Sequence, residues 1–285
     1  MYIRNAPPGN GASFQSVEVD GLEIHIHSTT SQHERQGLPA FVLVHGIGMS
    51  HRYLNRLHEV LADHGNTYSI DLPGFGSTRT PEDQLSMSDY AILLAHVLTR
   101  LEVSNAVLVG HSMGAQTVVE SAIEQPGLAS HLVLIGPAVD SARRTVSEQA
   151  LALLSNALME SPSLTGRQLL DLLRCGPRWF QRELPVVMSY PLEDRLSEVE
   201  QPVLVVRGGH DPVALPSWCQ RLADGARNGR LLEIPSHAHG VQHSAPGDVA
   251  AGILGFLDPN LADPAGPHII KVRGRAVGHE FLLRS

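Results

Sequence analysis

A serine flanked by glycines is the feature of this chain that best predicts chemistry. The sequence Gly-His-Ser-Met-Gly at residues 110–114 directly follows an apolar run over residues 106–109, and a helical pattern begins at Ala115. A turn this tight between a strand and a helix leaves no room for Cβ atoms beside the serine, which explains the glycines. We expect the Ser112 hydroxyl to stand at a sheet edge with a helix N-terminus behind it. Free N–H groups at such an end favour a developing oxyanion.

A serine hydroxyl is a poor nucleophile without a base, and that base needs an orienting acid. Two later loops offer these groups. The apolar run 203–206 leads into a loop with Asp211, and the run 231–234 leads into a loop with His237 and His239. Sites in open α/β sheets form just beyond the carboxyl ends of strands. In proteins with this strand–turn–helix serine elbow, the catalytic residues follow one another along the chain in the same order, Ser, Asp, His.

The elements that must position these residues are short apolar strands alternating with helical patterns. Continuous apolar runs of this kind are typical of parallel strands buried on both faces. Strands separated by helices predict an α/β fold with a mostly parallel sheet and helices on both faces. A hairpin with Asp20-Gly21 at its turn precedes them. The expected strands are 16–20, 23–28, 41–44, 68–70, 106–109, 132–135, 203–206 and 231–234, and the expected helices are 52–63, 88–101, 112–124, 217–224 and 247–257.

The alternation breaks after the sixth strand. Residues 139–200 contain no convincing strand but carry leucines at helical spacing, including Leu151, Leu154 and Leu158. We interpret this stretch as a helical cap over one end of the sheet, inserted into a core formed by residues 1–138 and 201–257. We expect residues 258–285 to form a tail in which 268–272 resembles a short strand. The alternatives for this tail are an extra edge strand, an oligomer contact and a disordered end.

Several motifs in order resemble the α/β-hydrolase family, over about residues 16–257. Besides the serine elbow they are His-Gly-Ile-Gly at 45–48, Asp-Leu-Pro-Gly-Phe-Gly-Ser at 71–77, the strand 203–206 followed by Asp211, and Pro235 four residues before His239. The resemblance is closest to esterases, lipases and C–C hydrolases with a helical cap. It implies the α/β-hydrolase fold.

Carried over residue by residue, the resemblance makes Ser112 the nucleophile, His239 the base and Asp211 the acid. The backbone N–H groups of Ile47 and Met113 would form the oxyanion hole. Two alternatives stay open. His237 competes with His239, and Asp140 competes with Asp211 because some family members carry the acid after the sixth strand.

The resemblance implies a cofactor-independent serine hydrolase acting on a carboxylic ester, lactone or thioester. The apolar residues of the cap favour an apolar acyl or aryl group, while its arginines serve either as surface charge or to bind a carboxylate. Alternatives are a C–C bond hydrolase, a hydroxynitrile-type lyase and a slow-turnover ligand receptor. Some family members that cleave C–C bonds carry Asn where His111 stands, which disfavours that subclass. The arginines in question are Arg143, Arg144, Arg174, Arg178 and Arg182.

Composition narrows the choice of partners. The formal net charge of −8 disfavours nucleic acid and anionic membranes, which leaves a small-molecule substrate.

Cys175 and Cys219 are the only cysteines and predict free thiols rather than a disulfide framework. We expect no signal peptide and no transmembrane helix, hence a soluble cytoplasmic protein. His237, His239 and His243 have a metal-like spacing, but histidine is frequent here and we expect no metal site. The oligomeric state is open.

Overall fold

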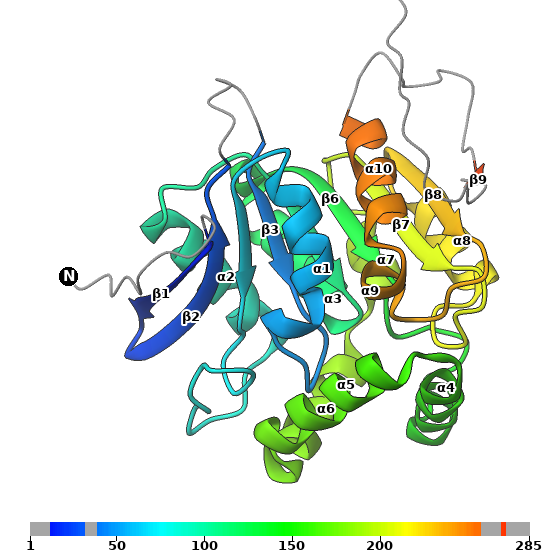
Figure 1. Cartoon of the computed structure of the whole chain (residues 1–285), viewed down its shortest axis with the longest axis horizontal. Coiled ribbons are helices and arrows are strands. Elements are labelled where there is room, and N and C mark those ends of the chain that lie inside the picture. The colour runs from blue at the N-terminus through cyan, green and yellow to red at the C-terminus, as the bar shows by residue number, and fades with distance from the viewer. Residues whose placement is uncertain (1–11, 32–38, 258–268, 272–285) are drawn as a thin grey trace, which may run out of the picture.

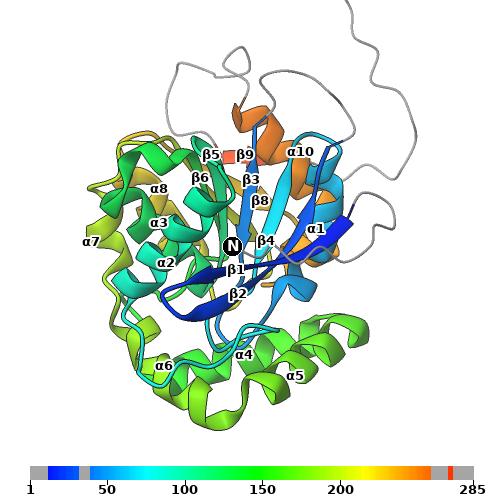
Figure 2. The same cartoon turned by 90° about the vertical axis from the view of Figure 1, so that its left-hand side faces the viewer.

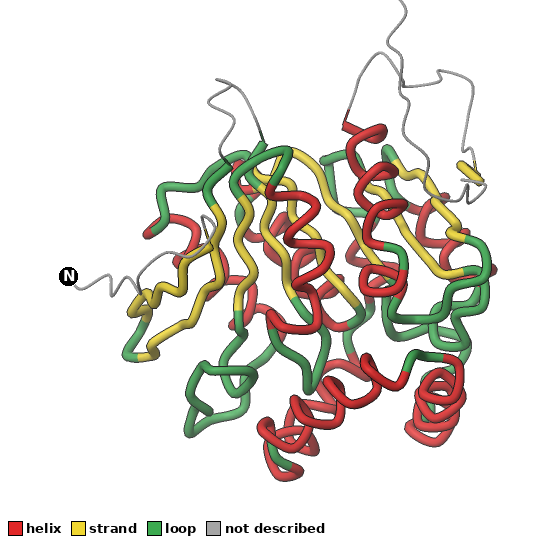
Figure 3. The backbone as a smooth tube through the Cα atoms, viewed as in Figure 1, coloured by secondary structure: helices red, strands yellow, loops and turns green. Residues whose placement is uncertain are grey.

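The computed structural model describes residues 12–31, 39–257 and 269–271. Within these ranges one sheet has the strand order β1-β2-β4-β3-β5-β6-β7-β8-β9 (Figures 1 and 3). Strands from β3 onward pair in parallel, while β1 and β2 join the edge antiparallel. The predicted α/β-hydrolase fold with a mostly parallel sheet is confirmed. The strands are β1 Ala12–Val19, β2 Leu22–Thr29, β3 Phe41–Val44, β4 Thr67–Ile70, β5 Ala106–His111, β6 Ala129–Ile135, β7 Val203–Gly208, β8 Gly229–Ile234 and β9 Ile269–Lys271.

The N-terminal hairpin forms where the sequence predicts it. Asp20 and Gly21 both have positive φ, 50° and 78°, as a tight two-residue turn requires, and Val19 pairs with Leu22 across it. The first strand begins at Ala12, earlier than expected. The lead-in over residues 1–11 lies outside the described residues.

Helices cover both faces of the sheet, as expected for strands that are apolar on both sides. Alternate residues of β3 enter different hydrophobic clusters, Val42 and Val44 in one and Phe41 and Leu43 in the other. The first cluster contains residues of α2, α3 and α8, and the second contains residues of α1 and α10, which Figure 2 shows on opposite sides. These helices are α1 His51–Ala62, α2 Met87–Arg100, α3 Met113–Glu124, α8 Pro216–Gly225 and α10 Pro246–Leu257; a 3₁₀ turn Pro126–Leu128 and the short α9 Val241–Ser244 complete the set outside the insertion.

Four helices lie between β6 and β7: α4 Val146–Met159, α5 Pro162–Cys175, α6 Pro177–Ser189 and α7 Leu192–Leu196. In Figure 1, α4, α5 and α6 lie across the end of the sheet toward which β3, β6 and β7 point. Helix α4 begins with a capping box between Thr145 and Glu148, and Ser161 caps α5. The leucines that indicated a helix here lie on its exposed side: Leu151, Leu154 and Leu158 are 62%, 63% and 85% exposed.

The tail contributes β9, which pairs in parallel with β8 at the far edge of the sheet. Residues 258–268 and 272–285 of the predicted tail lie outside the described residues. Cys175 and Cys219 are both free and buried. In the part of the chain that is described, none of the helices has the length and apolar character needed to span a bilayer.

Candidate active site

Ser112 lies at the sharp turn between β5 and α3. Its backbone angles are φ 54° and ψ −114°, a conformation rare for a non-glycine residue. The Ser112 N–H donates to the Ile135 carbonyl oxygen at 3.0 Å, which ties the turn to the neighbouring strand β6. A Cβ on Gly110 would overlap the Gly114 carbonyl oxygen, and a Cβ on Gly114 would overlap that of Val44. The packing therefore requires both glycines.

Asp211 and His239 meet beyond the ends of β7 and β8. The His239 Nδ1 lies 2.9 Å from the Asp211 Oδ2, and the other carboxylate oxygen accepts the Val213 and Ala214 N–H groups at 2.7 and 3.0 Å. Both side chains are buried. Since a carboxylate can only accept, the His239 Nδ1 carries the proton and Nε2 is the basic nitrogen.

Burial and pairing shift the pKa values of Asp211 and His239 in opposite directions. Burial by itself would raise the pKa of Asp211, but the facing His239 and the backbone donors hold that pKa below its usual range. Burial would likewise lower the pKa of His239, yet the Asp211 carboxylate and, more weakly, Glu160 raise it above the ordinary histidine value. The environment therefore favours an ionised Asp211 and makes His239 a stronger base.

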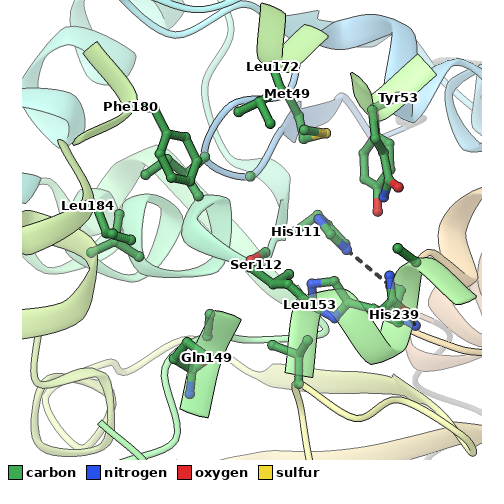
Figure 4. Close-up of a pocket in the computed structure, with 18 of the residues that line it drawn as sticks. Met49, Tyr53, His111, Ser112, Gln149, Leu153, Leu172, Phe180, Leu184 and His239 are labelled. Atoms are coloured by element: carbon green, nitrogen blue, oxygen red, sulfur yellow. Dashed lines mark hydrogen bonds between the residues drawn. The ribbon is translucent and has the colours of Figure 1, made fainter. Parts of the chain in front are cut away.

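Ser112 and His239 line the same cavity (Figure 4). Ile47 lines it as well, on the loop after β3. This loop packs tightly against the serine, since a Cβ on Gly46 would lie 3.1 Å from the Ser112 Cβ. Met113 is the first residue of α3, where backbone N–H groups have no partner within the helix. All five residues singled out for chemistry are thus gathered at one end of the sheet.

The two competing residues have other partners. His237 places its Nδ1 2.8 Å from the Ser244 hydroxyl. Asp140 pairs with the Arg221 guanidinium at 2.7 Å and accepts the Ala142 N–H at 2.9 Å. Within the described ranges, no three His, Cys, Asp or Glu side chains converge as a metal-ligand set.

The cavity encloses about 310 Å³, and its lining side chains are almost all uncharged. Its histidines are His111 and His239, and among the residues that the structure describes no Arg, Lys, Asp or Glu lines it. Met49, Phe180, Leu184 and Leu153 surround Ser112 in Figure 4. The complete lining is Gly46, Ile47, Met49, Tyr53, His111, Ser112, Ala138, Val139, Gln149, Leu153, Asn156, Ala157, Thr165, Gln168, Leu169, Leu172, Phe180, Leu184, Val187, Met188, Val213 and His239.

The arginines of the inserted segment therefore lie outside the cavity lining. Arg144 donates to the Tyr190 carbonyl oxygen, Arg174 pairs with Asp171, and Arg182 donates to the Glu82 carbonyl oxygen. The Arg144 contact joins the segment before α4 to the end of α6, the Arg174 pair lies within α5, and the Arg182 contact joins α6 to the core. They give the sequence-based alternative of a carboxylate-binding arginine no support in this cavity.

Two buried histidines, His45 and His111, flank the site and hold its loops by hydrogen bonds, the structural role that the sequence indicates for them. The Nδ1 of His45 donates to the Gly46 carbonyl oxygen at 2.8 Å while its Nε2 accepts the Leu72 N–H at 3.0 Å. The Nε2 of His111 donates to the His239 carbonyl oxygen at 3.2 Å. Burial lowers the pKa of His45 and brings the pKa of His111 to about 3, so both rings are neutral.

Arg207 supports the loop that carries Asp211, a role that was not predicted from the sequence. It is buried at the end of β7, donates from Nε to the Ala214 carbonyl oxygen at 3.0 Å, and pairs with Glu233. A charged residue directly after four apolar residues of a central strand was the signal in the sequence. Its guanidinium donates to backbone carbonyl oxygens of the loop that carries Asp211 and does not reach the Asp211 carboxylate oxygens.

Gly136 provides a direct test of how tightly the Asp–His pair is packed. Its φ is +51°, and a Cβ there would lie 2.9 Å from both Cε1 and Nδ1 of His239. We expect Gly136→Ala to lower the free energy of unfolding by about 1–3 kcal/mol, through the left-handed backbone and the crowded ring. Urea denaturation measures this change. The matched control is Gly127→Ala, since Gly127 has open space at its Cβ position. Equal stabilities of the two variants would contradict the packing described.

Comparison with known proteins agrees with this architecture. A model of the alpha/beta hydrolase family matches residues 41–252. The (E)-2-((N-methylformamido)methylene)succinate hydrolase of Acinetobacter baylyi is 22% identical over 268 residues, covering 83% of this chain and 97% of that protein. The 2-(acetamidomethylene)succinate hydrolase of Mesorhizobium japonicum is 27% identical over 200 residues, covering 70% and 67%. The structure of the enol-lactonase from Burkholderia xenovorans superposes with a TM-score of 0.67 at 19% identity, covering 85% of this chain and 99% of that one. Since the family match includes the serine elbow and both later loops, the chain belongs to the alpha/beta hydrolase family.

Proposed function

We propose that this chain is a cofactor-independent serine hydrolase that cleaves carboxylic esters with uncharged, apolar acyl or aryl groups. The observation that carries the proposal is an apolar cavity lined by both Ser112 and His239, with Asp211 behind the histidine. In this proposal residues 139–200 are a cap that shapes the cavity, and residues 1–138 and 201–257 form the catalytic core. The substrate is a small molecule.

In the proposed reaction the Ser112 Oγ attacks the acyl carbonyl carbon while the His239 Nε2 takes its proton. The backbone N–H groups of Ile47 and Met113 receive the developing oxyanion, a contribution typically worth about 3 kcal/mol per donor. The protonated His239 then gives its proton to the leaving alcohol. A water molecule then gives a proton to His239 and attacks the acyl carbon, the bond to the Ser112 Oγ breaks, and the protonated His239 returns the proton to that oxygen as the acid leaves.

The uncharged lining supports the substrate class. The two related hydrolases are named for derivatives of succinate, a dicarboxylic acid, and such substrates need a cation or several donors to offset the loss of water around each carboxylate. This cavity offers no lysine or arginine. Its polar lining residues Tyr53, Gln149, Asn156, Thr165 and Gln168 are uncharged, and the Gln149 amide already donates to the Arg143 carbonyl oxygen. Leu153, Leu169, Leu172 and Phe180 instead suit a hydrocarbon or aryl group. We therefore infer that this chain does not share the substrates of these relatives.

A matched pair of esters tests both parts of the proposal. We expect the kcat/KM for p-nitrophenyl butyrate to exceed that for p-nitrophenyl hemisuccinate by about 100-fold or more, because the second places an unpaired carboxylate in an apolar cavity. The release of nitrophenolate measures both rates. A preference for the hemisuccinate would contradict the substrate class. Failure to hydrolyse any member of a neutral series from acetate to decanoate and benzoate would contradict the ester hydrolase itself.

A further inference from the structure

Helix α4 of the insertion is hydrogen-bonded to the loop that carries His239. The Asn156 Oδ1 accepts the backbone N–H of His239 at 2.9 Å, and the Oε1 of Glu160, the residue directly after α4, accepts the N–H of Gly240 at 2.7 Å. Asn156 is 2% exposed. Asn156 lies in the last turn of α4 and Glu160 is the extended C-cap residue that follows it, so the C-terminal end of α4 presents two acceptors to two consecutive N–H groups.

These contacts complete the support of the histidine. Its Nδ1 is held by Asp211, its carbonyl oxygen by His111, and its N–H by Asn156. Gly240 is packed so closely that a Cβ there would lie 2.9 Å from the Glu160 Oε1. The core thus orients the ring and one side of the backbone, while the insertion fixes the other side. Small displacements of a reacting group cost large factors in rate.

We propose that Asn156 and Glu160 are positioning residues that make the placement of the His239 base depend on the docking of helix α4. This inference rests on the proposed function, because it assigns His239 as the base. When α4 is seated, the loop is held at two successive N–H groups. When α4 lifts away, those buried N–H groups lose their acceptors and the ring is held by core residues alone. The insertion therefore contributes to catalysis as well as to the shape of the cavity.

Glu160 also acts on His239 through its charge. The ionisable groups facing His239 are Asp211, Glu160 and the neutral His111. Those facing Glu160 are His239, Asp211 and Tyr53. The Glu160 carboxylate favours the protonated imidazole, so its removal lowers the pKa of His239. Since the base must be neutral to accept a proton, the acid limb of the kcat/KM profile then moves to lower pH.

The first experiment removes the acceptor for the His239 N–H. We expect Asn156→Ala to lower kcat for a neutral ester about tenfold or more, with a smaller change in KM, because a buried donor loses its partner beside the reacting group. The control is Leu158→Ala on the same helix, since Leu158 is 85% exposed and alanine keeps the helix propensity. Thermal unfolding of each variant verifies that it folds. An unchanged kcat, or a loss confined to KM, would overturn the positioning role of Asn156.

The second experiment separates the charge of Glu160 from its hydrogen bond. Glu160→Gln keeps an oxygen that can accept the Gly240 N–H, so we expect a kcat at the optimum within about threefold of the wild type and an acid limb about half a pH unit lower. Glu148→Gln is the control, because it removes a charge from the exposed start of α4 and preserves the capping box. An acid limb that stays in place would overturn the electrostatic role. Wild-type activity that Ser112→Ala leaves intact would instead refute the proposed function.

Discussion

Replacing Ser112 with alanine is expected to lower kcat for ester hydrolysis by about 10⁵-fold or more, which corresponds to about 7 kcal/mol of transition-state stabilisation. In the proposed mechanism no acyl-enzyme forms without the hydroxyl, and His239 loses the group whose proton it accepts. The rate that remains would then come from polarisation of the carbonyl by the proposed oxyanion donors, the N–H groups of Ile47 and Met113. KM should change little, because the cavity wall loses a single oxygen. Steady-state kinetics with p-nitrophenyl butyrate measures both constants.

The backbone at Ser112 makes this variant easy to interpret. Serine and alanine both carry a Cβ, so the strained φ of 54° and the close contact with Gly46 persist after the change. Ser130→Ala is the control, because Ser130 lies at the start of β6, the strand end opposite the cavity, and donates only to the Ala106 carbonyl oxygen. If Ser112→Ala kept more than about a tenth of the wild-type kcat, another nucleophile would have to carry the reaction.

The sequence predicted the fold well where local pattern and tertiary environment agree. Residues 41–44 and 203–206 form strands because unbroken apolar runs must be covered on both faces. The turn at Ser112 was predictable because its glycines are required by backbone contacts that any similar elbow would make. Strand order predicted that Asp211 and two candidate histidines lie just past neighbouring parallel strands, and the family resemblance selected His239 as the partner of Asp211.

Pattern alone was insufficient in the insertion. The spacing of Leu151, Leu154 and Leu158 indicated a helix correctly but not which way it faces, and these leucines lie outside while the less conspicuous Asn156 is buried. A hydrophobic stripe normally marks the buried face of a helix, so this rule predicts the wrong face for α4. The face of α4 is set instead by acceptors that match N–H groups far away in the sequence. No local signal reports such a match.

The sequence pattern was also insufficient to locate the charged side chains of the insertion. The arginines of the insertion suggested a carboxylate site by their number, yet Arg144 and Arg182 donate to backbone carbonyl oxygens and Arg174 pairs with Asp171. A long side chain can reach partners in many directions, so its position in the sequence does not fix where its charge lies. The resulting uncharged cavity was visible only once the helices were placed.

Replacing Asp211 with asparagine is expected to lower kcat by about 10⁴-fold. The present carboxylate can only accept, which forces the His239 proton onto Nδ1 and leaves Nε2 free to act as the base. An amide can turn its NH₂ toward Nδ1, which favours the opposite tautomer with a proton on Nε2. Loss of the negative charge also lowers the pKa of His239, since Asp211 is the largest influence that raises it. Kinetics across pH 5–9 measures the loss, which we expect to be incompletely recovered at any pH.

Asp140→Asn is the matched control, and it resolves the choice that the sequence left open between the two acids. Asp140 is buried like Asp211, but its carboxylate pairs with Arg221 and the Ala142 N–H rather than with His239. Breaking that ion pair costs stability, because it leaves a buried amide against a partly exposed guanidinium. It leaves the tautomer of His239 unchanged, so we expect kcat within about fivefold of the wild type. A 10⁴-fold loss in Asp140→Asn with an active Asp211→Asn would reverse the assignment, since only the acid that holds His239 in its basic tautomer can carry an effect of that size.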